Sequence, residues 1–166
     1  DIDGNEGDFS GYSVSLSADG TVVAIAADVN GDQSGSVKLY QNINGTWVQL
    51  GNDIDGEALE DYSGYSVSLS ADGTIVAIGA DGNDGNGVDS GHVRLYQYVD
   101  DGGSWVQIGN DIDGEYSDIY SGSSVSLSSD GTTVAIGAPY NSDNGLDSGH
   151  VRVYDTSVSS MAASPR

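Results

Sequence analysis

The sequence predicts an all-β chain in which a four-stranded antiparallel sheet is repeated. The tetrapeptide Asp-Ile-Asp-Gly occurs three times, starting at Asp1, Asp53 and Asp111. Each copy leads into the same series of short segments, which ends in Ser-Gly-X-Val-(Lys/Arg)-(Leu/Val)-Tyr. Glycine supplies 25 of the 166 residues, as expected for many strands joined by tight turns. No stretch shows a sustained helical apolar period, so we expect no helix.

The second copy shows how each strand follows from its residues. Residues 66–70 alternate serine with apolar residues, as in a half-buried strand. The Asp-Gly pair after them is typical of a hairpin turn. Residues 74–80 are almost continuously apolar, which suits a strand buried on both faces. Residues 92–96 alternate again, and residues 104–108 form the fourth predicted strand.

The other two copies give the same pattern, with one omission. The predicted strands are 13–17, 21–27, 36–41 and 46–50 in the first copy, and 124–128, 132–138 and 150–154 in the third. The third copy has no counterpart of the fourth strand. We expect residues 156–166 to form a C-terminal tail.

Four-stranded sheets repeated at this spacing are typical of β-propeller blades. A β-solenoid and a single β-sandwich are the alternatives, although solenoid coils are usually shorter and sandwiches rarely repeat so evenly. We expect one repeat region over 1–155, divided into blades at 1–52, 53–110 and 111–155. Propellers usually have roughly four to eight blades, so three are predicted to be half or part of a larger ring. The expected partners are other copies of the chain or flanking repeats, with surface proteins or glycans as further candidates.

The charge excludes several classes of partner. There are 26 acidic residues and 4 basic ones, which gives a net charge of −22. A nucleic-acid binder needs a basic face, and an anionic membrane surface would repel this chain. No apolar run approaches the length of a membrane span, and there is no cysteine. Cations are the natural partners, although acidity also keeps a β-rich protein soluble.

The repeated residues resemble FG-GAP repeats over about residues 1–154. The resemblance is carried by Gly-(Tyr/Ser)-Ser-Val, by Val-Ala-Ile-Gly-Ala-Pro at 134–139 and by Gly-His-Val-Arg-Val-Tyr at 149–154. It implies the propeller of integrin α subunits and of microbial or algal surface proteins, and with it an extracellular or cell-surface adhesion role. Integrin-type repeats carry a calcium loop between the first and second strands. Here that connection is a tight Asp-Gly turn, so calcium is not carried over from the resemblance.

Calcium is predicted instead from the acidic segment that joins the fourth strand to the next blade. Oxygen-bearing side chains recur there at the first, third, fifth and eighth positions around a glycine, which suits the hard oxygen shell of Ca²⁺. We expect the isoleucine between the two aspartates to pack inward and leave both carboxylates outside. A solvated acidic turn is the alternative. The candidate ligands are Asp1, Asp3, Asn5, Asp8, Asp53, Asp55, Glu57, Glu60, Asp61, Asp111, Asp113, Glu115 and Asp118.

A second acidic loop follows the second strand. In the first copy Asp28, Asn30 and Asp32 occupy alternate positions, a spacing that is also compatible with calcium. A flexible polar loop is the alternative. The other copies place Asp81, Asn83, Asp84 and Asp89, and Asn141, Asp143, Asn144 and Asp147, in the same loop.

Aromatic residues beside the acidic segment are candidates for binding a glycan. Phe9, Tyr62 and Tyr120 occupy the same place in the three copies and are predicted to form this surface. His92 and His150 are also equivalent, but two isolated histidines make a poor zinc site.

The basic residues are predicted to be structural. Lys38, Arg94 and Arg152 share one position in the third strand, where each is expected to pair with a carboxylate or to lie along aromatic rings.

Catalysis is not expected from the sequence. There is no Gly-X-Ser-X-Gly nucleophile elbow with histidine and aspartate context, and no carboxylate pair stands out. The sequence therefore predicts a structural and adhesion module with acidic, calcium-binding loops, and not an enzyme. A glycan-binding, lectin-like propeller is the alternative, and a hydrolase on a propeller scaffold is a third hypothesis.

Overall fold

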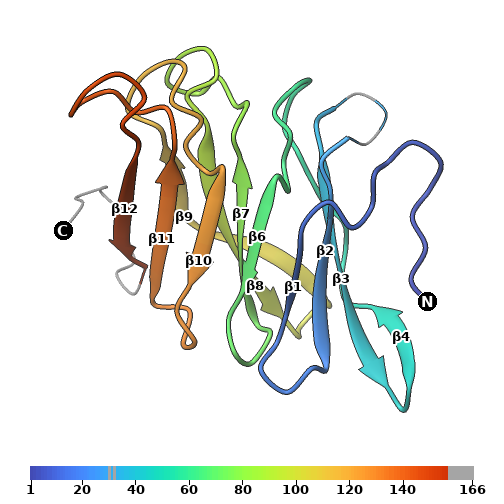
Figure 1. Cartoon of the computed structure of the whole chain (residues 1–166). Helices are drawn as coiled ribbons and strands as arrows, with labels where there is room; N and C mark the ends of the chain where they lie inside the picture. Colours follow the sequence, from blue (N-terminus) through green and yellow to red (C-terminus); the bar gives the residue numbers. More distant parts are fainter. Residues whose placement is uncertain (30, 32, 157–166) are drawn as a thin grey trace.

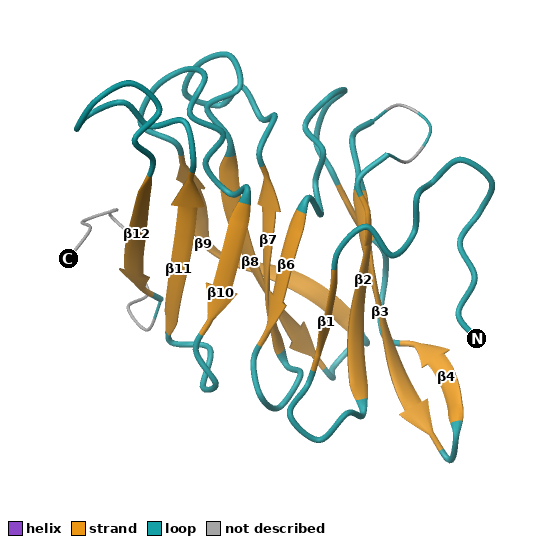
Figure 2. Cartoon of the chain, viewed as in Figure 1, coloured by secondary structure: helices purple, strands orange, loops and turns teal. Residues whose placement is uncertain are grey.

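The computed structural model describes residues 1–29, 31 and 33–156. These residues form strands, turns and loops without any helix, as Figure 2 shows. The strands make three antiparallel sheets that follow one another along the chain and stand side by side (Figure 1). The all-β, propeller-like class predicted from the repeats is therefore confirmed.

Each sheet is built from one run of consecutive strands. The first contains β1 (Val14–Leu16), β2 (Val22–Ala27), β3 (Ser36–Ile43), β4 (Thr46–Gln49) and β5 (Ile54–Asp55). The second contains β6 (Ser66–Leu69), β7 (Ile75–Ala80), β8 (His92–Val99) and β9 (Ser104–Asp113). The third contains β10 (Ser124–Leu127), β11 (Thr133–Ala138) and β12 (His150–Asp155). Every strand predicted from the sequence is present, and the third sheet has three strands.

One segment differs from the prediction, because Asp-Ile-Asp forms strand and not loop. Ile54–Asp55 pairs with β3, and the end of β9 pairs with β8 so that Ile112 lies opposite Val93. Gly51 (φ 81°) and Gly109 (φ 74°) precede these segments in left-handed backbone that favours glycine. The first two sheets therefore end at Asp55 and Asp113, beyond the repeat boundaries predicted at residues 52 and 110.

The apolar core lies between the sheets. One cluster joins the first two sheets, and a second joins the second sheet to the third. Ile54 and Ile112 belong to these clusters and are buried, which confirms that the isoleucine of Asp-Ile-Asp packs inward. Each blade therefore obtains its core from its neighbour, as propeller blades do.

Serine hydroxyls connect the first strands of neighbouring sheets. β1 contacts β6, and β6 contacts β10. The Leu69 backbone N–H donates to Ser15 Oγ at 2.9 Å, and the Leu127 N–H donates to Ser68 Oγ at 2.9 Å. The repeated Ser-Val-Ser-Leu therefore supplies apolar residues for the sheet and hydroxyls that bind the next blade.

The Asp-Gly turns are closed by a repeated set of hydrogen bonds. In the third sheet Asp130 Oδ1 accepts hydrogen bonds from Ser128 Oγ (2.7 Å), from the Thr132 hydroxyl (2.9 Å) and from the Thr132 backbone N–H (3.1 Å). Asp19 and Asp72 do the same in the first two sheets. This confirms the hairpins predicted from Asp-Gly.

The third sheet leaves one face open. Val151 and Val153 of β12 are 69% and 40% exposed, whereas their equivalents Val93 and Leu95 in the second sheet are 0% exposed because the third sheet covers them. Of the predicted tail, residues 157–166 lie outside the described residues. No helix among the described residues is long and apolar enough to cross a membrane.

Candidate functional site

A pocket of about 690 Å³ opens where the loops after β2, β7 and β11 gather, at the top of Figure 1. It is also lined by the segments that lead into β6 and β10. We call it the acidic pocket. Its lining residues are Asp28, Tyr62, Tyr65, Asp81, Asp118, Tyr120, Ser123, Pro139, Tyr140 and Asp147.

Two buried aspartates from equivalent places in the repeat line this pocket. Asp28 directly follows β2 and Asp81 directly follows β7, and they are 5% and 7% exposed. Ser123 Oγ donates to Asp81 Oδ2 at 3.2 Å. Asp28 Oδ1 is buried and accepts no hydrogen bond from any residue that the structure describes. In the third sheet the equivalent residue is Pro139, so the pair is confined to two blades.

Burial changes the acidity of both aspartates. It raises the pKa of the Asp81 carboxyl to about 6, and the nearby Asp89 and Asp28 carboxylates add to the rise. Burial also raises the pKa of the Asp28 carboxyl above its ordinary value. A carboxylate removed from water loses its hydration, and the described lining of the pocket contains no Lys, Arg or His that would stabilise the charge in its place.

The tyrosines of the pocket are held by the loop of the preceding blade. The Tyr62 hydroxyl donates to Gln33 Oε1 at 2.8 Å, and the Tyr120 hydroxyl donates to Asp89 Oδ2 at 3.2 Å. The ring of Tyr120 also meets that of Tyr140 edge to face, with centroids 5.3 Å apart. These contacts fix the two aromatic rings at the junctions between blades.

The structure brings together part of the predicted ligand and metal residues. Tyr62 and Tyr120 line the acidic pocket with Asp28 and Asp118, whereas Phe9 is 67% exposed and lies outside it. Asn30 and Asp32 lie outside the described residues.

Sequence reasoning did not assign several of the lining residues to a site. Asp81 and Asp147 belong to the second acidic loop of their repeats. Because Asp81 occupies the same repeat position as Asp28, it could have been predicted as a site residue from the sequence. Tyr65, Ser123 and Tyr140 gave no signal, because their role follows from the packing of one blade on another.

A second polar cluster lies between the first two blades and contains Arg94 of β8. Its Nε and Nη2 atoms donate to Asp111 Oδ1 and Oδ2 at 2.8 and 2.6 Å, and Nη2 also lies 2.5 Å from Glu57 Oε1. Gln107 Nε2 donates to Asp111 Oδ1 at 2.7 Å. The Arg94 hydrogen bonds hold the pKa of the Asp111 carboxyl below its ordinary value. Arg94 therefore links the acidic segments of two successive repeats.

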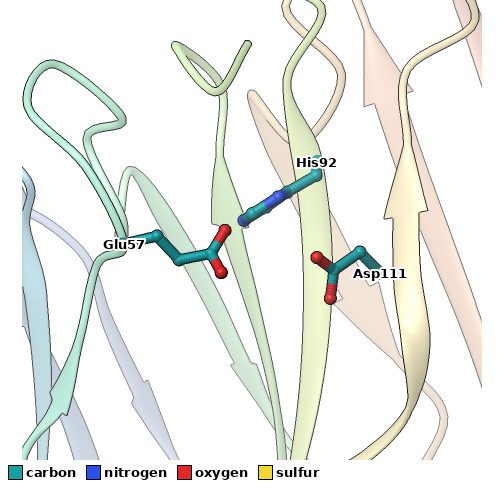
Figure 3. Close-up of side chains that lie close together, drawn as sticks. All are labelled: Glu57, His92 and Asp111. Atoms are coloured by element: carbon teal, nitrogen blue, oxygen red, sulfur yellow. The ribbon is translucent and has the colours of Figure 1, made fainter. Parts of the chain in front are cut away.

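His92 adds a third potential metal ligand to this cluster, as Figure 3 shows. Ligand atoms of Glu57, His92 and Asp111 all lie within 4.8 Å of one another. Burial lowers the pKa of the His92 imidazole, so it is neutral at neutral pH. However, both carboxylates already pair with Arg94, and the arrangement therefore favours an ion-pair network over a metal centre.

The first and third sheets have versions of the same network. Lys38 Nζ lies 3.5 Å from Asp53 Oδ2, and Gln49 Nε2 donates to Asp53 Oδ1 at 2.6 Å. In the third sheet Arg152 pairs with Glu115, and His150 Nδ1 lies 3.8 Å from the same carboxylate. The prediction that the three basic residues pair with carboxylates is confirmed.

These contacts separate the residues predicted to form one calcium cage in each copy. Asp53 pairs with a cation of the first sheet, whereas Glu57, four residues later, pairs with Arg94 of the second. Asp61 is buried and accepts a hydrogen bond from Asn83 Nδ2 at 3.1 Å. The reason is that Asp-Ile-Asp is an extended strand and does not curl around one point. Calcium binding by these segments stays a prediction.

The remaining candidate ligands lie at the surface. Asn5 Nδ2 donates to Asp8 Oδ2 at 2.8 Å, and both line a small cavity of about 50 Å³ with Asp3 and Lys38. The side chains left are exposed: Asp1, Asp55, Glu60 and Asp113.

Comparison with known proteins identifies the repeats. The FG-GAP repeat family model matches residues 54–96 and 111–154. The chain belongs to the FG-GAP repeat family. No similar sequence was found among curated proteins.

Solved structures with a similar fold belong to longer chains. They include a Bacteroides fragilis protein provisionally described as a 6-phosphogluconolactonase (TM-score 0.60, 11% identity), Saccharomyces cerevisiae Sqt1 (0.56, 13%) and the periplasmic gluconolactonase PpgL of Pseudomonas aeruginosa (0.54, 19%). The matches cover 93%, 95% and 86% of this FG-GAP chain but only 36%, 35% and 38% of the solved ones. The chain therefore spans little more than a third of these proteins.

These structures correct one expectation. The sequence predicted that the chain is not an enzyme, because it lacks a nucleophile elbow and no carboxylate pair stands out. Propellers of the same fold include proteins described as lactonases, so the inference from missing motifs to absence of catalysis was wrong. Fold alone does not decide between binding and catalysis.

Proposed function

We propose that this FG-GAP chain is part of an extracellular or cell-surface adhesion propeller that binds a neutral glycan in the acidic pocket. The observation that carries the proposal is the placement of Tyr62 and Tyr120 beside buried aspartates in one cavity. Aromatic faces with a few polar groups are the usual lining of small-molecule sites. The glycan-binding role, given above as the alternative, is thus the one that the pocket favours.

Backbone conformation supports a role for these tyrosines beyond packing. Tyr62 and Tyr120 have φ angles of 53° and 55°, and Phe9, their equivalent in the first repeat, has 51°. Bulky residues rarely adopt this left-handed conformation, which costs about 1–3 kcal/mol at each position. Glycine would avoid that strain, so the aromatic ring at this position is inferred to have a function of its own.

The charge of the pocket narrows the class of ligand. Four carboxylates line it, and no Lys, Arg or His occurs among its described lining residues. Like charges in a partly dry site repel strongly. We therefore infer that neutral sugars or amino sugars bind, and that phosphorylated, sulfated or sialylated sugars do not.

A glycan array followed by calorimetry on the strongest neutral hit tests this function. Tyr120→Ala and Tyr62→Ala are expected to weaken binding by about tenfold or more, because each removes an aromatic face from the pocket. Phe9→Ala is the matched control, since it has the same repeat position and backbone conformation but lies outside the pocket. Equal binding by all three variants, or hits confined to anionic glycans, would contradict the proposal.

Hydrolysis of a sugar lactone is a second candidate function. It is supported by the resemblance to proteins described as gluconolactonases and by pocket carboxylates, which can act as general acids or bases. The acidic lining favours an unphosphorylated lactone over a phosphorylated one. Pure protein would be assayed with gluconolactone against spontaneous hydrolysis, and a rate equal to the background would remove this candidate.

We also propose that a further FG-GAP blade covers the open face of the third sheet. Val151 and Val153 are exposed where the second sheet buries Val93 and Leu95. Ser124 on β10 is exposed too, whereas its equivalent Ser66 donates a hydrogen bond to the Gly122 carbonyl of the next blade at 2.7 Å. A second copy of the chain or a flanking repeat can supply the covering blade.

A further inference from the structure

The buried aspartates Asp28 and Asp81 have no Lys, Arg or His among the described lining of their pocket. The Arg94 network supplies a cation to each of its acids, and the turn aspartates receive hydroxyl and N–H donors. Within the described residues, Asp28 Oδ1 accepts no hydrogen bond, although Asp28 is only 5% exposed.

A buried carboxylate oxygen without a hydrogen bond destabilises the folded protein unless a ligand binds to it. Burying a polar group without a hydrogen bond costs roughly 1–3 kcal/mol by protein mutational data, and a charged group costs more. The cost is greater here because Asp81 lies in the same pocket with its own buried carboxyl, and Asp118 and Asp147 line the rim. The pocket residues that the structure describes offer no Lys or Arg as counter-charge.

We propose that Asp28 and Asp81 together bind a Ca²⁺ ion inside the acidic pocket, across the junction between the first two blades. The donors available are oxygens: the two carboxylates, with Ser123 Oγ next to Asp81. No His or Cys lines this pocket, so the donor set suits a hard cation and disfavours zinc or copper. Water and the remaining carboxylates of the rim can complete the oxygen shell.

The raised pKa values of the two aspartates agree with a pocket in which the described lining supplies no cation. Burial raises both pKa values, and a bound divalent cation would reverse that effect by favouring the ionised carboxylates. The site differs from the calcium loop considered along the sequence, since its two ligands come from different blades and are not neighbours in one loop. It also does not depend on the glycan-binding role, because the ion can be measured without any sugar.

Terbium luminescence provides the test. Tb³⁺ takes calcium-like oxygen sites and is excited by nearby tyrosines, and four tyrosines line this pocket. The wild-type chain is expected to give tyrosine-sensitised luminescence that Ca²⁺ displaces. Asp28→Asn and Asp81→Asn are each expected to weaken the binding of Tb³⁺ and of Ca²⁺ roughly tenfold or more, because calcium affinity depends on the charge of the ligands. Asp101→Asn, in an exposed turn between β8 and β9, is the control that should leave binding unchanged.

Circular dichroism and melting temperatures distinguish loss of calcium binding from loss of folding in the variants. Both asparagine variants remove a buried charge and are expected to remain folded by circular dichroism. CaCl₂ should raise the melting temperature of the wild type and of Asp101→Asn by mass action, and should raise that of the two pocket variants clearly less. Absence of calcium binding to the wild type would overturn the proposal. Unchanged binding in Asp28→Asn and Asp81→Asn would overturn it as well, because the ion would then lie elsewhere on this acidic surface.

Discussion

Arg94 of β8 binds Asp111 of β9 through two parallel hydrogen bonds of 2.8 and 2.6 Å. The same guanidinium reaches Glu57, which belongs to the connection that leads from the first sheet into the second. One arginine thus fixes the two Asp-Ile-Asp-Gly segments that flank the second blade. In the first sheet Lys38 makes a single longer contact with Asp53, so this network is strongest at the centre of the chain.

Replacing Arg94 is expected to destabilise the protein more than replacing Lys38. Arg94→Met leaves Asp111 and Glu57 without their cationic partner in a half-buried site, and loss of one member of a buried ion pair costs about 3 kcal/mol. The more exposed Lys38→Met should cost under about 1 kcal/mol. Urea unfolding followed by tryptophan fluorescence measures both. Equal losses would show that the network adds nothing beyond a surface ion pair.

The Asp-Gly turns predict an acid-dependent stability. Hydrogen bonds from Ser128 and Thr132 lower the pKa of Asp130 to about 2 from its ordinary value of 3.8. Because the folded-state pKa is the lower one, the stabilising contribution is complete above pH 4, declines as pH falls through that range and is lost below about 2. Asp130→Asn should therefore flatten the stability curve between pH 4 and 2.

Carbon-detected NMR titration of the Asp130 carboxyl checks this directly. Asp101→Asn, in an exposed turn, is the comparison that should leave the acid limb of the curve unchanged. A midpoint for Asp130 near that of an ordinary aspartate would contradict the role given to the turn hydrogen bonds.

Trp105 is expected to contribute more to stability than Trp47, its equivalent in the first repeat. Trp105 is buried between the first two sheets, and its Nε1–H donates to the Leu50 carbonyl at 2.8 Å. Trp105→Ala should cost about 3–5 kcal/mol, as truncation of a buried aromatic does. Trp47 is only half-buried, at the outer edge of the array, so Trp47→Ala should cost clearly less. Guanidinium unfolding monitored by circular dichroism compares them, and the reverse order would contradict the assigned interface.

The open third blade predicts self-association of the isolated chain. Light scattering should give a mass above that of one chain, because association buries the exposed side chains of Val151 and Val153. Val151→Glu is expected to produce a smaller species by placing a charge on that face. Val88→Glu is the control, since Val88 is similarly exposed but lies in a loop. A well-folded wild-type monomer would contradict a second copy of this chain as the covering blade.

The strands were predictable because they depend on local patterns. Ser-Val-Ser-Leu before Asp-Gly, and the apolar run after it, specify β6 and β7 without information from the rest of the chain. The burial of Ile112 was predictable for the same reason. The pairing of Asp-Ile-Asp with the third strand was not, because it depends on a glycine interruption after the fourth strand and on the return of the chain to β8.

The candidate site was less predictable than the fold. Tyr62 and Tyr120 could be selected from their repeat position, but the same rule selected Phe9, which has no preceding blade beside it among the described residues. Arg94 joins Glu57 of its own repeat to Asp111 of the next, and the placement of Asp28 and Asp81 in one pocket requires two blades packed side by side. Sequence spacing describes one repeat at a time, whereas both sites are made between repeats.

A crystal structure of the chain grown with CaCl₂ and the best neutral glycan would show directly whether the acidic pocket binds both. We expect an ion between Asp28 and Asp81 and a sugar ring against Tyr120 in the acidic pocket. A ligand bound elsewhere, such as on the Arg94 network, with the acidic pocket holding only water, would contradict it.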